Sequence, residues 1–277
     1  MGPLFFILYI NDLSRTFSFF RFILFADDTN IFASGKDRVG LYRRVNLELG
    51  KLSHWFAHNR LTLNYSKTEF VDFSKPAVGS SASSLGLFLD RVAVRKVDQS
   101  KFLGVHIDRD VSWWVHIGKI ISKTSQTVGV IGRAWGFMDG PQLSLLYNTM
   151  VLPHLQYCLV NWGNFKGDRN IGLRDGILTL QKCLVRIICK AHRISHADPL
   201  FAKLGILKID DLYAQSVRVF FYKMSRDMLP DGMTGLINRV SHQYSTRGAR
   251  SDFSVEYSDS RSIETLLLRL GTHCLWN

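Results

Sequence analysis

The chain has 277 residues, of which 46% are hydrophobic, and its formal net charge is +12 with a pI near 9.7. A chain of this length and apolar content can bury a sizeable core, so the composition argues against a disordered protein. The excess of cations favours a polyanionic partner, with nucleic acid first and an acidic membrane surface second.

The N-terminal apolar segments do not have the pattern of a targeting or membrane segment. A signal peptide requires a basic region before its apolar run, and residues 1–10 lack one. The next apolar run, residues 17–25, is interrupted by Arg21 and is shorter than a membrane span. We therefore predict no export signal and no transmembrane helix.

The cysteine pattern favours an intracellular protein of the nucleus or cytoplasm, because it contains no paired spacing of the kind found in disulfide frameworks. Two cysteines and two histidines lie close together, but their spacing does not match the usual zinc sites. The four cysteines are Cys158, Cys183, Cys189 and Cys274, and the histidines are His192 and His196.

The first predicted element is a helix that Gly2-Pro3 opens, since proline is favoured in the first turn of a helix. Its apolar residues predict a wide stripe that faces the core. They are Leu4, Phe5, Leu8, Tyr9 and Leu13.

An acidic hairpin is predicted next. The apolar runs 22–25 and 31–33 are separated by turn-forming residues that include Asp27 and Asp28. Burying two adjacent carboxylates between apolar strands is costly unless a cation neutralises them, so the pattern suggests a hard metal such as Mg²⁺. The alternative is a solvated Asp-Asp turn.

The segment after the hairpin predicts one long helix and several strands. Asp37 can cap a helix in which Leu41 to Phe56 show helical apolar spacing. Residues 64–66 predict a turn between two extended segments, which places Lys67 where the chain changes direction. Residues 102–108 predict a further strand, in which Gly104 permits close approach of another backbone.

From Val111 the apolar residues follow a helical period, so we place a domain boundary there. One of these helices is predicted to carry four cations on a single face, which is either a solvated surface or a surface that contacts phosphates. The cations are Lys182, Arg186, Lys190 and Arg193. From about residue 233 the sequence is polar and loosely patterned, which predicts an irregular tail.

Two strings resemble consecutive motifs of the reverse transcriptase of a non-LTR (LINE, jockey-like) retrotransposon, in order and in spacing. They are GPLFFILYINDL at residues 2–13 and FADD at residues 25–28. LTLN at 61–64 with Lys67-Thr68 resembles the next palm motif, and FLGV at 102–105 resembles the primer-grip strand. The helical half resembles the thumb and downstream region of the same polyproteins, through LQY at 155–157, LQK at 180–182 and LWN at 275–277.

The resemblance implies an α+β fold in three parts: a partial palm at 1–110, a helical thumb-like domain at 111–232 and an irregular C-terminal tail at 233–277. It implies RNA-directed DNA polymerase activity with Mg²⁺, an RNA template and a DNA primer. It gives Asp27 the role of holding the metal ions and Asp28 that of assisting or tuning the site.

The resemblance also implies roles for Lys67 and for the 102–104 segment. By this resemblance, Lys67 is expected near the pyrophosphate, as a proton donor or electrostatic stabiliser. The alternative is a surface lysine after a turn. Phe102, Leu103 and Gly104 support the primer end, a role that is compatible with an ordinary sheet strand.

In that family another aspartate comes from an upstream strand, which here precedes Met1, and the fingers precede it too. We therefore expect this chain not to polymerise alone, since positioning and charge neutralisation supply nearly all of the catalysis in such transfers. One alternative is a non-catalytic nucleic-acid-binding remnant. Another is a translated pseudogene fragment that folds poorly because an open sheet edge and apolar surface are exposed.

Overall fold

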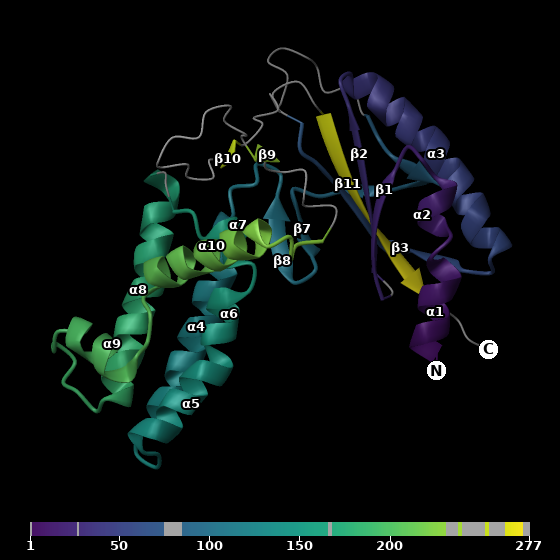
Figure 1. Ribbon diagram of the computed structural model, residues 1–277. Coiled ribbons are helices and arrows are strands. Elements are labelled where there is room, and N and C mark those ends of the chain that lie inside the picture. The colour runs from purple at the N-terminus through teal and green to yellow at the C-terminus, as the bar shows by residue number, and fades with distance from the viewer. Residues whose placement is uncertain are drawn as a thin grey trace, which may run out of the picture. The chain divides into compact units, whose positions relative to one another are not determined.

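The computed structural model describes residues 2–26, 28–74, 85–165, 168–230, 238–239, 253–254 and 264–273. The chain divides into two compact units, which we call unit 1 (Met1–Ser112 with Asp259–Asn277) and unit 2 (Trp113–Ser258). Both helices and strands occur (Figure 1), so the predicted α+β class is confirmed. Among the described residues, no helix is long and apolar enough to cross a membrane.

In the part of the chain that the structure describes, unit 1 combines three helices with most of the strands. The helices are α1 (Gly2–Ile10), α2 (Leu13–Thr16) and α3 (Arg38–His58). The longer strands are β1 (Arg21–Phe25), β2 (Asp28–Gly35), β3 (Thr62–Asp72), β7 (Gln99–Phe102), β8 (Val105–Asp108) and β11 (Glu264–His273). The short strands are β4 (Phe88–Leu89), β5 (Val92–Ala93) and β6 (Arg95–Lys96).

The main sheet has the strand order β1-β2-β11-β3-β6. Strand β11 is antiparallel to both of its neighbours, β2 and β3, so these two strands run in the same direction with one strand between them. Helix α3 joins β2 to β3, and Figure 1 shows the yellow strand β11 between them. This is a split β-α-β unit, in which the central strand comes from a distant part of the sequence.

The predicted irregular tail is therefore wrong at Glu264–His273, which forms β11. The local pattern is ambiguous, because the run Leu266 to Leu268 does not alternate between apolar and polar residues. A strand with neighbours on both sides can carry such a run, but the neighbours come from residues about 200 positions earlier in the chain. Local pattern does not contain that information.

The core of unit 1 lies between the sheet and α3. The Asp37 side chain accepts hydrogen bonds from the Val39 and Gly40 N–H groups, which confirms the predicted N-cap. The helical residues predicted to face inward are all buried, and they pack with Ile31 and Ala33 of β2. They are Leu41, Val45, Leu49, Leu52 and Phe56.

Helix α1 begins at Gly2 as predicted, but four of the five residues of the predicted apolar stripe do not face the core. Leu4, Phe5, Leu8 and Tyr9 are exposed, whereas Phe6 and Ile10 are buried with Leu13 of α2. Since this helix is apolar all round, helical spacing alone does not distinguish the face that packs on the core.

Unit 2 is mostly helical. Its helices are α4 (Trp114–Ala134), α5 (Gly140–Met150), α6 (Leu152–Gln156), α7 (Leu159–Trp162), α8 (Asp168–Ile188), α9 (Asp198–Leu204) and α10 (Ile209–Ser225). The short strands β9 (Asn238–Arg239) and β10 (Phe253–Ser254) pair with each other. The core is built around the fully buried side chains of Tyr147, Trp162 and Ile177.

A buried glutamine joins α8 to the start of α10. Gln181 Nε2 donates to the Tyr147 hydroxyl at 3.1 Å and to the Leu207 carbonyl at 3.1 Å, and its Oε1 accepts from the Ile209 N–H at 2.9 Å. Arg174 reinforces the same junction with two hydrogen bonds to the Asp210 carboxylate, at 2.7 and 2.5 Å. The glutamine of the LQK string thus has a structural role.

Replacing Gln181 with leucine is expected to destabilise unit 2 by about 3 kcal/mol, because it leaves the buried Ile209 N–H without its acceptor and removes the hydrogen bond to the partly buried Leu207 carbonyl. Urea unfolding followed by circular dichroism measures the change. Gln215→Leu, at an exposed position of α10, is the matched control and should leave stability almost unchanged. Equal stability of the two variants would show that the Gln181 hydrogen bonds contribute nothing.

Candidate active site

The predicted acidic hairpin is present. Strands β1 and β2 pair antiparallel, from Arg21 opposite Phe32 to Phe25 opposite Asp28. Ala26, in the connection, has φ of 50°, as residues of two-residue hairpin turns often do. Asp27 lies outside the described residues, and Asp28 is the first residue of β2 with a partly buried side chain.

The strands that flank Asp28 place no second carboxylate beside it. The residues opposite Asp28 are Phe25 on β1 and Gly271 on β11. The one acid of β11, Glu264, pairs with Gly35 at the other end of β2. Because the described residues give a single carboxylate here, they do not by themselves form a two-metal centre, which requires carboxylates from more than one position.

The other described residues do not form a metal site either. Within the described part of the chain, no group of three or more His, Cys, Asp or Glu side chains is arranged to hold a metal ion. Next to Asp28, the hydroxyl of Thr29 is buried without a hydrogen-bond partner among the described residues. A metal role for the hairpin therefore depends on Asp27 and on ligands beyond those that the structure describes.

Lys67 lies in a bulge of β3 rather than at a turn between two strands, so that part of the sequence prediction is wrong. Glu69 pairs with Arg269 of β11 and Asn64 pairs with Gly271, so residues 65–68 stand opposite the single residue Leu270. The Asn64 side chain supports the bulge by accepting from the Lys67 N–H at 3.2 Å. The turn-forming residues 64–66 do interrupt the regular strand, but they form a bulge within β3 and not a turn between two strands.

Along the strand direction, Lys67 lies beside the end of the sheet that carries the acidic hairpin turn. Leu270 and Gly271, beside the bulge, pair on their other side with Thr29 and Asp28. The backbones of β2 and β3 are therefore about 10 Å apart here, since each strand spacing is about 4.8 Å. The Lys67 side chain is exposed. The register thus places an exposed cation two strands from Asp28.

Tyr65, in the same bulge, donates a hydrogen bond to the Asp90 carboxylate at 2.7 Å. This hydrogen bond, with burial and the negative charge of Asp90, raises the pKa of Tyr65 to about 12. We expect Asp90→Asn to lower that pKa toward the ordinary value of 10, because the charged acceptor is removed. Titration of ring-labelled tyrosine by NMR measures it, with Asp110→Asn as control, and an unchanged pKa would contradict the bond.

Phe102, Leu103 and Gly104 form the end of a hairpin, not a continuous strand as predicted. Strands β7 and β8 pair from Gln99 opposite Asp108 to Phe102 opposite Val105, and Leu103 and Gly104 have φ of 44° and 88°. Positive φ at both positions is typical of a two-residue hairpin turn, and glycine permits it without strain. The Phe102 ring packs edge-on against Phe32 of β2, with centroids 5.9 Å apart.

The four predicted cations do not share one helix face. Helix α8 ends at Ile188, and Lys190, with φ of 51°, lies in the turn that follows it. Lys182 and Arg186 are on α8 and partly buried, and Arg186 Nε donates to the Ser195 carbonyl at 2.9 Å. Lys190 and Arg193 are exposed. The prediction failed because the apolar pattern continues to Ala191, past the end of the helix.

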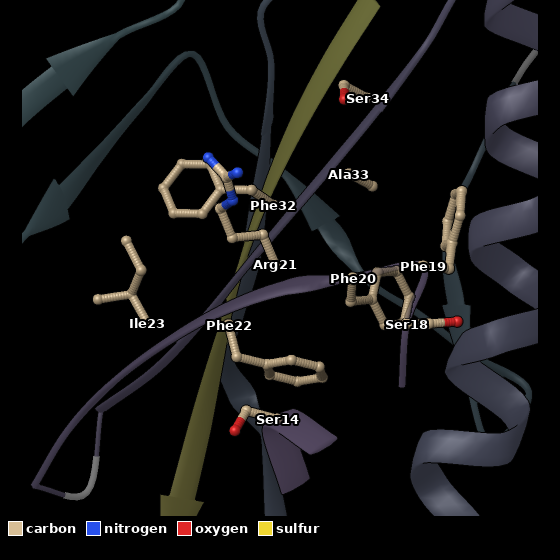
Figure 2. Close-up of a pocket in the computed structure, with 10 residues that line it drawn as sticks. All are labelled: Ser14, Ser18, Phe19, Phe20, Arg21, Phe22, Ile23, Phe32, Ala33 and Ser34. Carbon is tan, nitrogen blue, oxygen red and sulfur yellow. The ribbon is translucent and has the colours of Figure 1, made fainter. Parts of the chain in front are cut away.

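A cavity of about 790 Å³ lies at the start of β1, away from the acidic turn. Figure 2 shows Arg21 extending toward the Phe32 ring at this cavity, where β2 continues past the first residue of β1. Its polar lining consists of this arginine and three serines, Ser14, Ser18 and Ser34. Among the described residues, no carboxylate lines this cavity.

Residues 1–107 match the family model described as reverse transcriptase (RNA-dependent DNA polymerase). The matched region contains the acidic hairpin, the Lys67 bulge and the β7–β8 turn. No curated protein and no solved structure matches the chain. The match supports a reverse transcriptase domain in this part of the chain.

Proposed function

We propose that the chain is part of the RNA-directed DNA polymerase of a non-LTR retrotransposon of the LINE, jockey-like kind, acting in the nucleus or cytoplasm. Residues 1–110 are then part of the palm, residues 111–232 a thumb-like helical domain, and β11 in the C-terminal segment an additional strand of the palm sheet. The observation that carries the proposal is the acidic β1–β2 hairpin inside the region that matches the reverse transcriptase family.

In this proposal Asp27 holds divalent cations, with Mg²⁺ the family-implied ion, and Asp28 assists or tunes the site. Such cations, when bound, activate the primer hydroxyl and stabilise the leaving pyrophosphate. Lys67 offers a positive charge two strands away, suited to the pyrophosphate. The β7–β8 turn at Phe102, Leu103 and Gly104 is proposed to support the primer end.

We further propose that these 277 residues do not polymerise by themselves. Asp28 has Phe25 and Gly271 as its strand neighbours, so β1 and β11 supply no carboxylate beside it. Two cations close together require more negative charge than one hairpin turn provides. A strand with an acid next to the hairpin, from another segment, is the missing element.

The test uses a longer polypeptide that contains this chain and extends a DNA primer on an RNA template. Asp27→Asn is expected to abolish extension, by roughly a thousandfold or more, because it removes a charge that stabilises the transition state. Asp110→Asn, an exposed acid of the same unit, is the control and should retain full activity. Unchanged extension by Asp27→Asn would refute the metal role.

The second candidate function is a non-catalytic nucleic-acid-binding module. It is favoured by the net charge of +12 and by the exposed cations Lys190 and Arg193. Binding of this kind weakens steeply with salt, with a slope of about 0.9 per phosphate contacted in duplex DNA. Salt-independent binding, or no binding, would contradict it.

A further inference from the structure

The turn between α4 and α5 holds two exposed aromatic rings. Trp135 follows the last residue of α4 and is 48% exposed, and Phe137 is 92% exposed. The backbone of the turn is hydrogen-bonded, since the Phe137 and Met138 N–H groups both donate to the Ala134 carbonyl at 3.0 Å. A phenylalanine held in this position buries almost no apolar surface, so the fold gains little from it.

One of these rings contacts a cation, and further cations lie nearby in the sequence. Lys190 Nζ lies 5.6 Å from the centroid of the Trp135 ring, a cation–π distance. The start of α5 and the end of α8 approach closely here, since a Cβ at Gly140 would lie 3.5 Å from the Ile188 carbonyl oxygen. Figure 1 shows the α4–α5 turn and the C-terminal end of α8 at the same end of unit 2. Exposed Arg133 precedes Trp135, and exposed Arg193 follows Lys190.

One acid, Asp139, follows this turn, and it is part of the α5 capping box with Gln142. Arg133 lies just before the turn, and Lys190 and Arg193 follow the end of α8, so three exposed cations stand close in sequence to these two helix ends. We call Arg133, Trp135, Phe137, Lys190 and Arg193 the Trp135 surface. Exposed rings among cations are complementary to a ligand that presents both flat apolar groups and negative charge.

We propose that the Trp135 surface binds single-stranded nucleic acid, with bases stacked on Trp135 and Phe137 and phosphates contacting Arg133, Lys190 and Arg193. Stacking on exposed rings requires bases that are not already paired and stacked within a duplex. An apolar protein partner would cover Phe137 but would leave the cations without counter-charges. The proposal deepens the proposed function by naming a site for one nucleic-acid strand, and it does not depend on catalysis.

The experiment measures the fluorescence anisotropy of labelled oligo-dT and oligo-rU, each of about 15 nucleotides, with the full chain. Trp135→Ala and Phe137→Ala are each expected to weaken binding by roughly 5- to 100-fold, the range for loss of one stacking ring. Trp135→Tyr should restore most of the affinity, because it retains a stacking ring. Lys190→Gln should lower the slope of log K against log salt by about 0.7.

The matched control is Tyr222→Ala. Tyr222 is 58% exposed on α10, and the Arg226 guanidinium lies 5.7 Å from its ring, so it is an aromatic–cation pair outside the Trp135 surface. Its loss should leave affinity unchanged. Wild-type binding by both Trp135→Ala and Phe137→Ala, or an equal loss in Tyr222→Ala, would overturn the proposal. Because primer extension is not measured, the result is independent of the Asp27→Asn test.

Discussion

Replacing Leu268 with proline is expected to unfold unit 1 and to leave the helices of unit 2 folded. Leu268 is in the middle of β11, opposite Ile31 of β2 and Phe70 of β3. Proline has no N–H for the ladder and is excluded from central strands. The loss should be roughly 3 kcal/mol or more, a large part of the stability of an ordinary domain.

Hydrogen exchange measures this effect residue by residue. The amides of β2 and β3 should lose protection in the Leu268→Pro variant, while those of α4 serve as an internal reference in unit 2. Leu268→Val is the matched control, because valine keeps the N–H and favours extended backbone. Retained protection of β2 and β3 in the proline variant would show that β11 is not needed for the sheet.

Strand β11 is the part of the unit 1 sheet that could not be predicted from the sequence. Helix α3 could be predicted with its cap and its buried face, because Asp37 and the apolar spacing of its core residues are close in sequence. The β1–β2 hairpin could be predicted for the same reason. The position of β11 could not, because a strand is specified by its neighbours as well as by its own residues, and these neighbours are distant in the chain.

The candidate site follows the same rule. The acids and Lys67 could be singled out from sequence. The position of Lys67 along the sheet could not, because it depends on the bulge opposite Leu270. The aromatic rings at Trp135 and Phe137 were missed, because an aromatic residue near the end of an apolar helix is normally interpreted as core. The contact of Lys190, in the turn after α8, with the Trp135 ring joins segments that are far apart in sequence, so it is visible only in three dimensions.

A buried aspartate at the end of β3 was also missed, since one acid at a strand end gives no sequence signal. Asp72 accepts hydrogen bonds from Arg38 at 2.6 Å, Tyr42 at 2.9 Å, Lys96 at 3.0 Å and the Ser74 N–H at 3.1 Å. Burial raises the pKa of Asp72, but these four hydrogen bonds outweigh it and hold that pKa well below its usual range. The carboxylate thereby ties β3 to α3 and β6.

Replacing Asp72 with asparagine is expected to destabilise the chain by about 3 kcal/mol, measured by urea unfolding at neutral pH. The amide has nearly the same size but no charge, and only one of its two polar atoms can accept, so it cannot serve the two cations, the Tyr42 hydroxyl and the Ser74 N–H together. The loss is placed at the low end of the range for broken buried pairs, about 3–5 kcal/mol. The reason is that the side chains of Arg38 and Lys96 are 28% and 40% exposed, so water can partly replace the carboxylate.

The pH dependence separates this charge effect from a simple packing defect. Because the pKa of Asp72 is lower in the folded than in the unfolded chain, its stabilisation is complete above the unfolded pKa of about 3.9 and is lost as pH falls below it. The stability difference between wild type and Asp72→Asn should therefore shrink below about pH 4. Asp98→Asn, at an exposed position, should have the same stability as wild type both at neutral pH and below about pH 4. A gap between wild type and Asp72→Asn that is constant with pH would mean that the carboxylate is not held ionised by its four donors.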